Sequence, residues 1–128
     1  RADGGGKAGL DGGDKLMLGA VTGGAVRLTQ AQGPLLSGEG IESTLSAYIL
    51  LGDPTVTAWA ALSANGVRGL RLPRAPGEMI VAVDGETAGR EAGRALAQRA
   101  TAAGWRVRIA DPGNGLDFND LLQREGVA

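Results

Sequence analysis

Short apolar runs alternate with longer amphipathic stretches over residues 34–128. The runs have the length of strands and the stretches that of helices, with Gly, Pro, Asn or Asp between them. The expected strands cover residues 35–37, 56–61, 79–83 and 105–110, and the expected helices cover 42–51, 87–103 and 117–124. This alternation predicts an α/β fold, in which helices flank a mostly parallel four-stranded sheet.

Two of these segments also indicate which of their residues are buried. The run 79–83 is apolar without a break, which is typical of a parallel strand covered on both faces. In the helix over 42–51, one face collects Ile41, Leu45, Tyr48 and Ile49, so Tyr48 is interpreted as a core residue and not as a nucleophile.

The first part of the chain follows another pattern. Residues 1–14 are rich in Gly and Asp and are expected to be loose. Strand-like runs at 15–18 and 25–28 flank a Thr-Gly-Gly turn, which predicts a short β-hairpin. We therefore expect residues 1–33 to precede a domain that spans 34–128.

Composition excludes several kinds of chemistry. The 128 residues contain neither Cys nor His, so a Cys nucleophile, a His general base and an ordinary zinc site are ruled out for this chain. The net charge of −1 is unlike that of a free-standing nucleic-acid binder, so either this domain handles small ligands or basic domains elsewhere hold the polymer. No run has membrane-spanning length, no signal peptide is visible, and the lack of Cys fits the reducing cytoplasm.

Acidic residues follow two of the expected strands. Glu39 lies between Gly38 and Gly40, and Asp84 and Glu86 flank the glycine that follows the run 79–83. Because parallel strands present their carboxyl ends at one edge, we expect these side chains to face the same crevice. Clustered carboxylates are hard oxygen ligands that suit Mg²⁺ or Mn²⁺, which points to phosphoryl chemistry on nucleotides or nucleic acid.

Plainer interpretations stand beside this one. Glu39 could be a solvated loop acid, and Asp84 or Glu86 could cap the helix from residue 87. Asp117 and Asp120 have the spacing of a capping box, although Asp117 could also line the same acidic edge.

Basic residues leave a similar choice. Most of the arginines on the helix after Asp84 and between the second and third expected strands are expected on solvated faces, although some could meet phosphates: Arg90, Arg94, Arg68, Arg71 and Arg74. Lys15 and Arg27, in the expected hairpin, are candidates for phosphate contacts if that hairpin packs beside the acidic edge.

The stretches 36–47, 84–89 and 117–122, together with 23–28, resemble the Toprim domain of primases and primase-helicases from phages, plasmids and other mobile elements. The resemblance covers residues 34–122. It implies a Toprim-like, Rossmann-like sheet, a proton-transfer or metal-binding role for Glu39, and Mg²⁺ ligation by Asp84, Glu86 and Asp117.

The chain departs from the family pattern at three positions. Glu86 stands where the family usually has Asp, Ser43 where many primases have a further Asp, and Asn119 where primases often have another. These departures bear on the number of metal ions that the domain binds.

The leading hypothesis is therefore the Toprim catalytic domain of a DNA primase-like protein, which joins nucleotides into an RNA primer on a DNA template. Zinc-binding and helicase domains would lie in the same full-length protein. A Toprim nuclease and a non-catalytic Toprim binding or assembly module are the alternatives. A Rossmann-type dinucleotide site is disfavoured because the first strand lacks a Gly-x-Gly-x-x-Gly motif.

Overall fold

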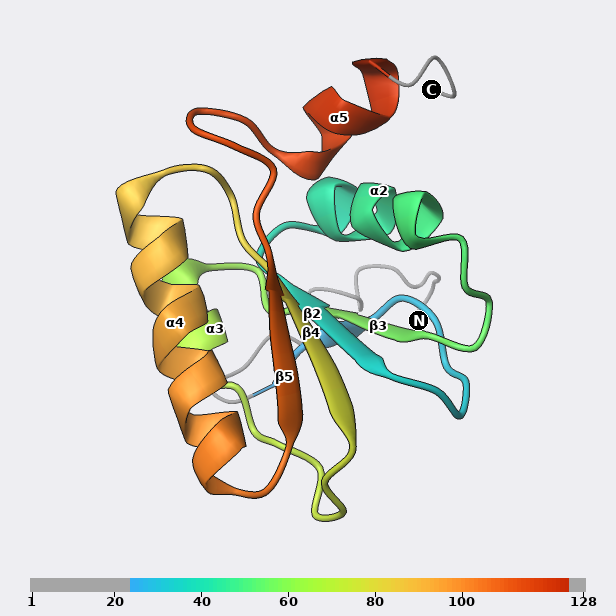
Figure 1. Ribbon diagram of the computed structural model, residues 1–128, viewed down its shortest axis with the longest axis vertical. Coiled ribbons are helices and arrows are strands. Elements are labelled where there is room, and N and C mark those ends of the chain that lie inside the picture. The colour runs from blue at the N-terminus through green and yellow to red at the C-terminus, as the bar shows by residue number, and fades with distance from the viewer. Residues whose placement is uncertain (1–23, 125–128) are drawn as a thin grey trace, which may run out of the picture.

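The computed structural model describes residues 24–124, which form one sheet with helices on both faces (Figure 1). The strands are β1 (Val26–Arg27), β2 (Leu35–Gly38), β3 (Thr57–Ala60), β4 (Glu78–Ala82) and β5 (Arg106–Ala110). The helices are α2 (Ile41–Leu51), α3 (Ala64–Arg68), α4 (Thr87–Ala102) and α5 (Phe118–Arg124). The predicted α/β class, the four parallel strands and the helices between them are confirmed.

The sheet has the order β1-β3-β2-β4-β5. Strands β2 to β5 are parallel, and β2 lies between β3 and β4. The edge strand β1 runs antiparallel to β3, where Val26 is opposite Ala60 and Arg27 is opposite Trp59. The other half of the predicted hairpin, residues 15–18, lies outside the described residues, as does the segment 1–14.

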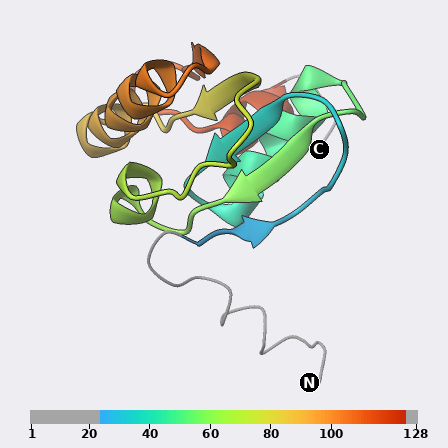
Figure 2. The same cartoon turned by 90° about the horizontal axis from the view of Figure 1, so that it is seen from below.

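Helices lie on both faces of the sheet, as the view from below shows (Figure 2). Two clusters of apolar side chains fill the space between the sheet and these helices. On one face, α3 and α4 contribute Val67, Ala92 and Leu96 to a cluster with β2 and β4. On the other face, α2 and α5 contribute Ala47 and Phe118 to a second cluster. Strand β4 supplies side chains to both layers, which explains its unbroken apolar sequence.

The buried face of α2 is not the apolar face that the sequence indicates. Leu45 is 36% exposed and Ile49 is 54% exposed, whereas Thr44 and Ala47 are buried against the sheet. Apolar residues surround this helix on nearly every side, so their spacing selects no single face. Small side chains face the sheet instead and allow a close approach. Tyr48 is partly buried and packs against the second cluster, in agreement with a core role.

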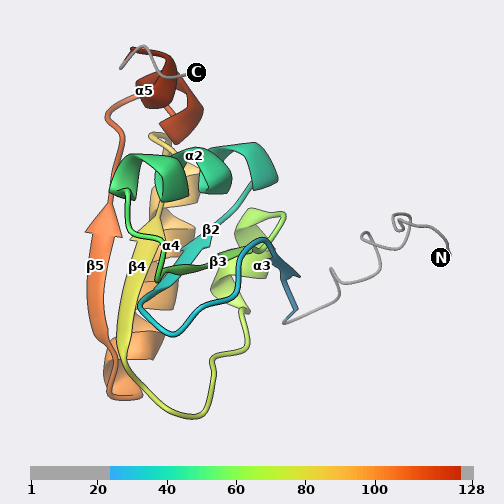
Figure 3. The ribbon, with the colours of Figure 1, turned by 90° about the vertical axis from the view of Figure 1, so that its right-hand side faces the viewer.

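Helices α2 and α5 lie together near the carboxyl ends of β4 and β5 (Figure 3). The segments that follow β2 and β4 therefore lead into the region beside these two helices. This arrangement gathers the acidic loops of the chain at one edge of the sheet.

Candidate functional site

Four acidic residues stand at or beyond the carboxyl ends of adjacent strands. Glu39 comes directly after β2, and Asp84 comes two residues after the end of the neighbouring strand β4. Glu86 is the residue that precedes α4, and Asp117 immediately precedes α5. The topology thus places the acidic residues singled out from the sequence in the segments at one sheet edge.

Two of the carboxylates at this edge, Glu39 and Asp84, have raised pKa values. The pKa of Glu39 is raised by burial first, and then by the negative charges of Asp84 and Glu86. The pKa of Asp84 is also raised, chiefly by burial and then by the charge of Asp117, with a smaller effect from Glu86. The neighbouring negative charges make Glu39 and Asp84 harder to ionise, so this edge favours a cation or a proton.

Ser43 in the first turn of α2 reaches the same group of residues. Its hydroxyl donates a hydrogen bond of 3.4 Å to Oδ1 of Asp84, which acts to lower the pKa of that carboxyl. The Ser43 oxygen also accepts a hydrogen bond of 3.4 Å from the backbone N–H of Phe118. One short side chain therefore joins α2, the Asp84 loop and the start of α5.

A second contact between α2 and α5 involves another position where the family pattern is broken. Ser46 Oγ lies 3.3 Å from Oδ1 of Asn119 and hydrogen-bonds to it. Asn119 therefore faces α2, and its amide serves the packing of the two helices.

Asp117 and Asp120 form a capping box at the start of α5. Asp117 Oδ1 accepts a hydrogen bond of 2.9 Å from the N–H of Asp120, and Asp120 Oδ2 accepts one of 2.9 Å from the N–H of Asp117. The capping interpretation of this pair is confirmed. Glu86 differs, because it occupies the N-cap position of α4 but makes no capping hydrogen bond through its side chain.

The glycine between Asp84 and Glu86 is required by a close approach of two loops. Gly85 N–H donates to the carbonyl of Leu116 at 2.7 Å, and Gly115 N–H donates to the carbonyl of Gly85 at 2.7 Å. A Cβ atom on Gly85 would collide with the carbonyl oxygen of Gly113. The segment that leads to Asp117 is thereby held against the Asp84 loop.

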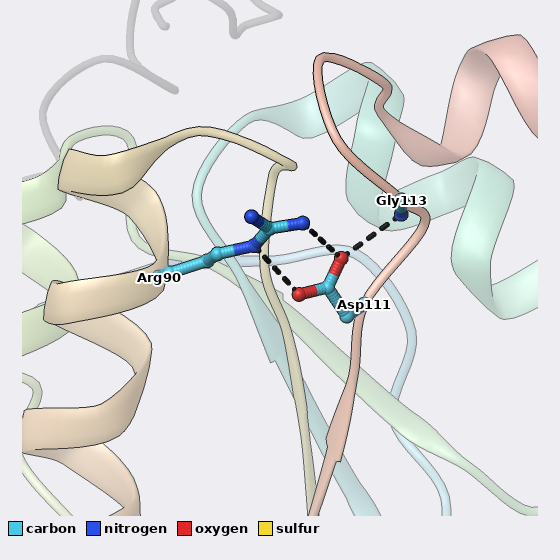
Figure 4. A network of polar contacts seen from close by, with 3 residues as sticks. All are labelled: Arg90, Asp111 and Gly113. Carbon is cyan, nitrogen blue, oxygen red and sulfur yellow. Dashed lines mark hydrogen bonds and ion pairs between the residues drawn. The ribbon is translucent and has the colours of Figure 1, made fainter.

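An ion pair that the sequence did not reveal fixes the same segment to α4 (Figure 4). Arg90 Nε and Nη2 donate to the two carboxylate oxygens of Asp111 at 2.7 and 3.0 Å, and Asp111 Oδ1 also accepts from the N–H of Gly113 at 2.9 Å. These hydrogen bonds hold the pKa of Asp111 below its usual range. Arg90, expected on a solvated face, instead positions the loop that carries Asp117.

The donor set is chemically suited to Mg²⁺ or Mn²⁺, since it consists of carboxylate oxygens whose charges repel one another. The acidic side chains are nevertheless not close to one another. Within residues 24–124, no three acidic side chains are gathered closely enough to hold a metal ion as they stand. The close convergence expected from the sequence is thus not seen, and binding would require carboxylate side chains to turn toward a shared ion.

Of the two residues expected to contact phosphate, the structure describes only Arg27. Arg27 lies on the edge strand β1 with its Cζ 5.1 Å from the centroid of the Trp59 ring, and it does not contribute to the pKa shifts of Glu39 or Asp84. Lys15 lies outside the described residues. Within residues 24–124, every helix is too short or too polar to cross a membrane.

The comparison with known families agrees with this arrangement. The Toprim domain matches residues 35–128, which is most of the chain, and the chain belongs to this family. It is also similar, at 24% sequence identity and a TM-score of 0.44, to a crystal structure of a DNA primase domain from Pseudomonas aeruginosa. That similarity takes in 73% of this chain and 30% of the other. No curated protein sequence matches the chain.

Proposed function

We propose that this chain is the Toprim catalytic domain of a DNA primase-like protein, which carries out Mg²⁺-dependent nucleotidyl transfer to make RNA primers on a DNA template. The observation that carries the proposal is the coupling of Glu39, Asp84 and Glu86 at one sheet edge, with raised pKa values at the first two. The stretches that resemble primase Toprim domains favour primer synthesis over other Toprim activities. In this proposal, any zinc-binding or helicase domains would lie in other parts of the full-length protein, which would also help to hold the template.

In this proposal the carboxylates have two different roles, metal binding and proton transfer. Asp84 and Glu86, with Asp117 beside them, would hold the divalent cation, which supplies charge neutralisation of the triphosphate and activation of the attacking hydroxyl. Glu39 accepts the proton of the primer 3′-hydroxyl, because a carboxylate with a raised pKa is a better base near neutral pH. Ser43 keeps Asp84 in place through its hydrogen bond, and the Arg90–Asp111 pair keeps Asp117 near Asp84.

The test is primer synthesis by the full-length protein with Glu39→Gln and Asp84→Asn. Loss of the base is expected to slow synthesis by roughly 10²–10⁴-fold, and loss of the ligand by a similar factor. Glu91→Gln is the matched control, since Glu91 is an exposed acid on α4 that pairs only distantly with Arg68 at 3.9 Å. Undiminished synthesis by Asp84→Asn would refute the assigned role.

One structural observation supports a second candidate, a Toprim module that binds or assembles without chemistry. Ser43 and Asn119 replace acids of the primase pattern, and both side chains are used in helix packing. The same assay separates the two candidates, because an assembly module would make no primer with or without Glu39.

A further inference from the structure

A cavity away from the acidic edge lies on the face of the sheet that also carries α3 and α4. It has a volume of about 410 Å³, and its lining includes Arg27, Gln30, Trp59 and Arg71. Among residues 24–124, no carboxylate lines this cavity. Two guanidinium groups in one cavity, with no acid among the lining residues that the structure describes, are suited to an anion with several oxygens, such as a phosphate.

A second cavity adjoins the first and differs in character. Its volume is about 290 Å³, and it is lined by both tryptophans, Trp59 and Trp105, and by small and apolar residues. Its lining also includes three polar residues, Gln32, Thr57 and the exposed Glu78. Trp59 and Pro73 line both cavities, so the two compartments meet at these residues. Two indole rings in one cavity are suited to a flat aromatic ligand group.

The surroundings of Trp59 preorganise the place where the two cavities meet. Arg27 lies over its ring, which fixes the guanidinium beside the cavity and reduces the entropy lost when it binds a ligand. The indole N–H of Trp59 is buried and has no hydrogen-bond partner in the part of the chain that the structure describes. An orphaned donor at such a position calls for an oxygen from water or from a ligand.

We propose that these two cavities form a binding site for one nucleotide of a single-stranded nucleic acid, with its phosphate between Arg27 and Arg71 and its base among Trp59 and Trp105. A charged compartment beside an aromatic one matches the way proteins hold single strands. The site does not depend on the metal or on catalysis.

The position of the site explains why a strand fits better than a free nucleotide. Trp59 is opposite Ser37 in the sheet, and Glu39 follows two residues later, about 7 Å along the strand. A strand anchored at Trp59 can therefore continue toward the acidic edge. Both cavities lie against β3, and the charged one also includes residues beside β1, at the sheet margin away from β5.

The test measures binding of a fluorescent eight-nucleotide oligothymidylate to the 128-residue chain in EDTA, by anisotropy over a range of salt. Arg27→Gln/Arg71→Gln is expected to weaken binding at least tenfold and to lower the salt slope by about 0.7, since the two arginines hold one phosphate and each phosphate neutralised on a single strand contributes about 0.7. Arg108→Gln removes an exposed arginine from the opposite edge strand β5 and is expected to change affinity less than twofold.

Further measurements show which kind of ligand binds and whether it binds at this site. An abasic oligonucleotide is expected to bind more weakly, and inorganic triphosphate is expected to compete poorly. In a Trp105→Phe background the oligonucleotide is expected to quench Trp59 fluorescence. If that background does not fold, the arginine variants still decide, because both side chains are exposed. Unchanged binding by the double variant, an equal loss with Arg108→Gln, or equal competition by triphosphate would overturn the proposal.

Discussion

Ser43 Oγ lies 3.4 Å from Oδ1 of Asp84, and the hydrogen bond between them opposes the burial and charge that raise the pKa of that carboxyl. The two residues are 41 positions apart in the chain. The contact places a neutral hydroxyl where many primases are expected to have another carboxylate. It therefore reduces the repulsion at the acidic edge and, in the proposed function, also removes one metal ligand.

Replacing Ser43 by Asp tests this relationship. The added charge is expected to destabilise the chain without metal by about 1 kcal/mol, through repulsion with Asp84, and to tighten Mn²⁺ binding by roughly tenfold. Thermal unfolding with EDTA or Mn²⁺ measures both effects. Ser43→Asn is the neutral control of similar shape, and tighter Mn²⁺ binding by this variant would show that charge is not the cause.

Stability is expected to depend on pH through Glu39 and Asp84. Their pKa values in the folded chain lie above the ordinary values of 4.5 and 3.8, so the folded state holds these protons more tightly than the unfolded state does. The free energy of unfolding therefore falls as pH rises from those ordinary values through the raised ones, and the loss is complete above them.

Glu39→Gln and Asp84→Asn remove this cost. Each is expected to raise the free energy of unfolding at about pH 7 by roughly 0.5 kcal/mol, since both side chains are partly exposed and water screens the repulsion. Urea unfolding at about pH 4 and pH 7 checks the result, and the gain should shrink at the lower pH. A loss of stability at neutral pH would contradict the account.

Gly85→Ala is expected to be strongly destabilising, by more than about 2 kcal/mol, because the new Cβ would strike the carbonyl of Gly113. Gly40→Ala is the matched control. Gly40 also adjoins an acidic residue of the site, has no atom within 4 Å of a built Cβ, and has an ordinary φ of −93°. Urea unfolding of both variants measures the difference, and equal stabilities would contradict the described loop contact.

Arg90→Gln is expected to release the 111–117 segment from α4. Its amides at 113–116 should exchange hydrogen faster, and the pKa of Asp111 should rise toward its ordinary value as the guanidinium is lost. Hydrogen exchange with mass spectrometry and a carbon-detected NMR titration measure these changes. Arg94→Gln, one helical turn further along α4, is the control and should leave both unchanged.

The sequence predicts those features that depend on local pattern and on strand direction. The unbroken run at β4, and the acids at the ends of β2 and β4, are enough to place Glu39 and Asp84 at one edge. The spacing of Asp117 and Asp120 predicts their capping box in the same local way.

Other features depend on contacts between distant residues, and no local pattern reports them. Arg90 and Asp111 are 21 positions apart, and Ser43 and Phe118 are 75 apart. The orientation of α2 was predicted wrongly for another reason. Its apolar residues surround the helix, so only packing against the sheet determines that Leu45 and Ile49 face outward.

Metal binding by the isolated chain tests the central claim most directly. We expect titration with Mn²⁺, followed by electron paramagnetic resonance of the free ion, to show binding that Asp84→Asn weakens at least tenfold. Asp53→Asn, in an exposed loop after α2, should bind like the unaltered chain. Equal Mn²⁺ affinity in the unaltered chain and in Asp84→Asn, or no binding at millimolar Mn²⁺, would contradict a metal-dependent active site at this edge of the sheet.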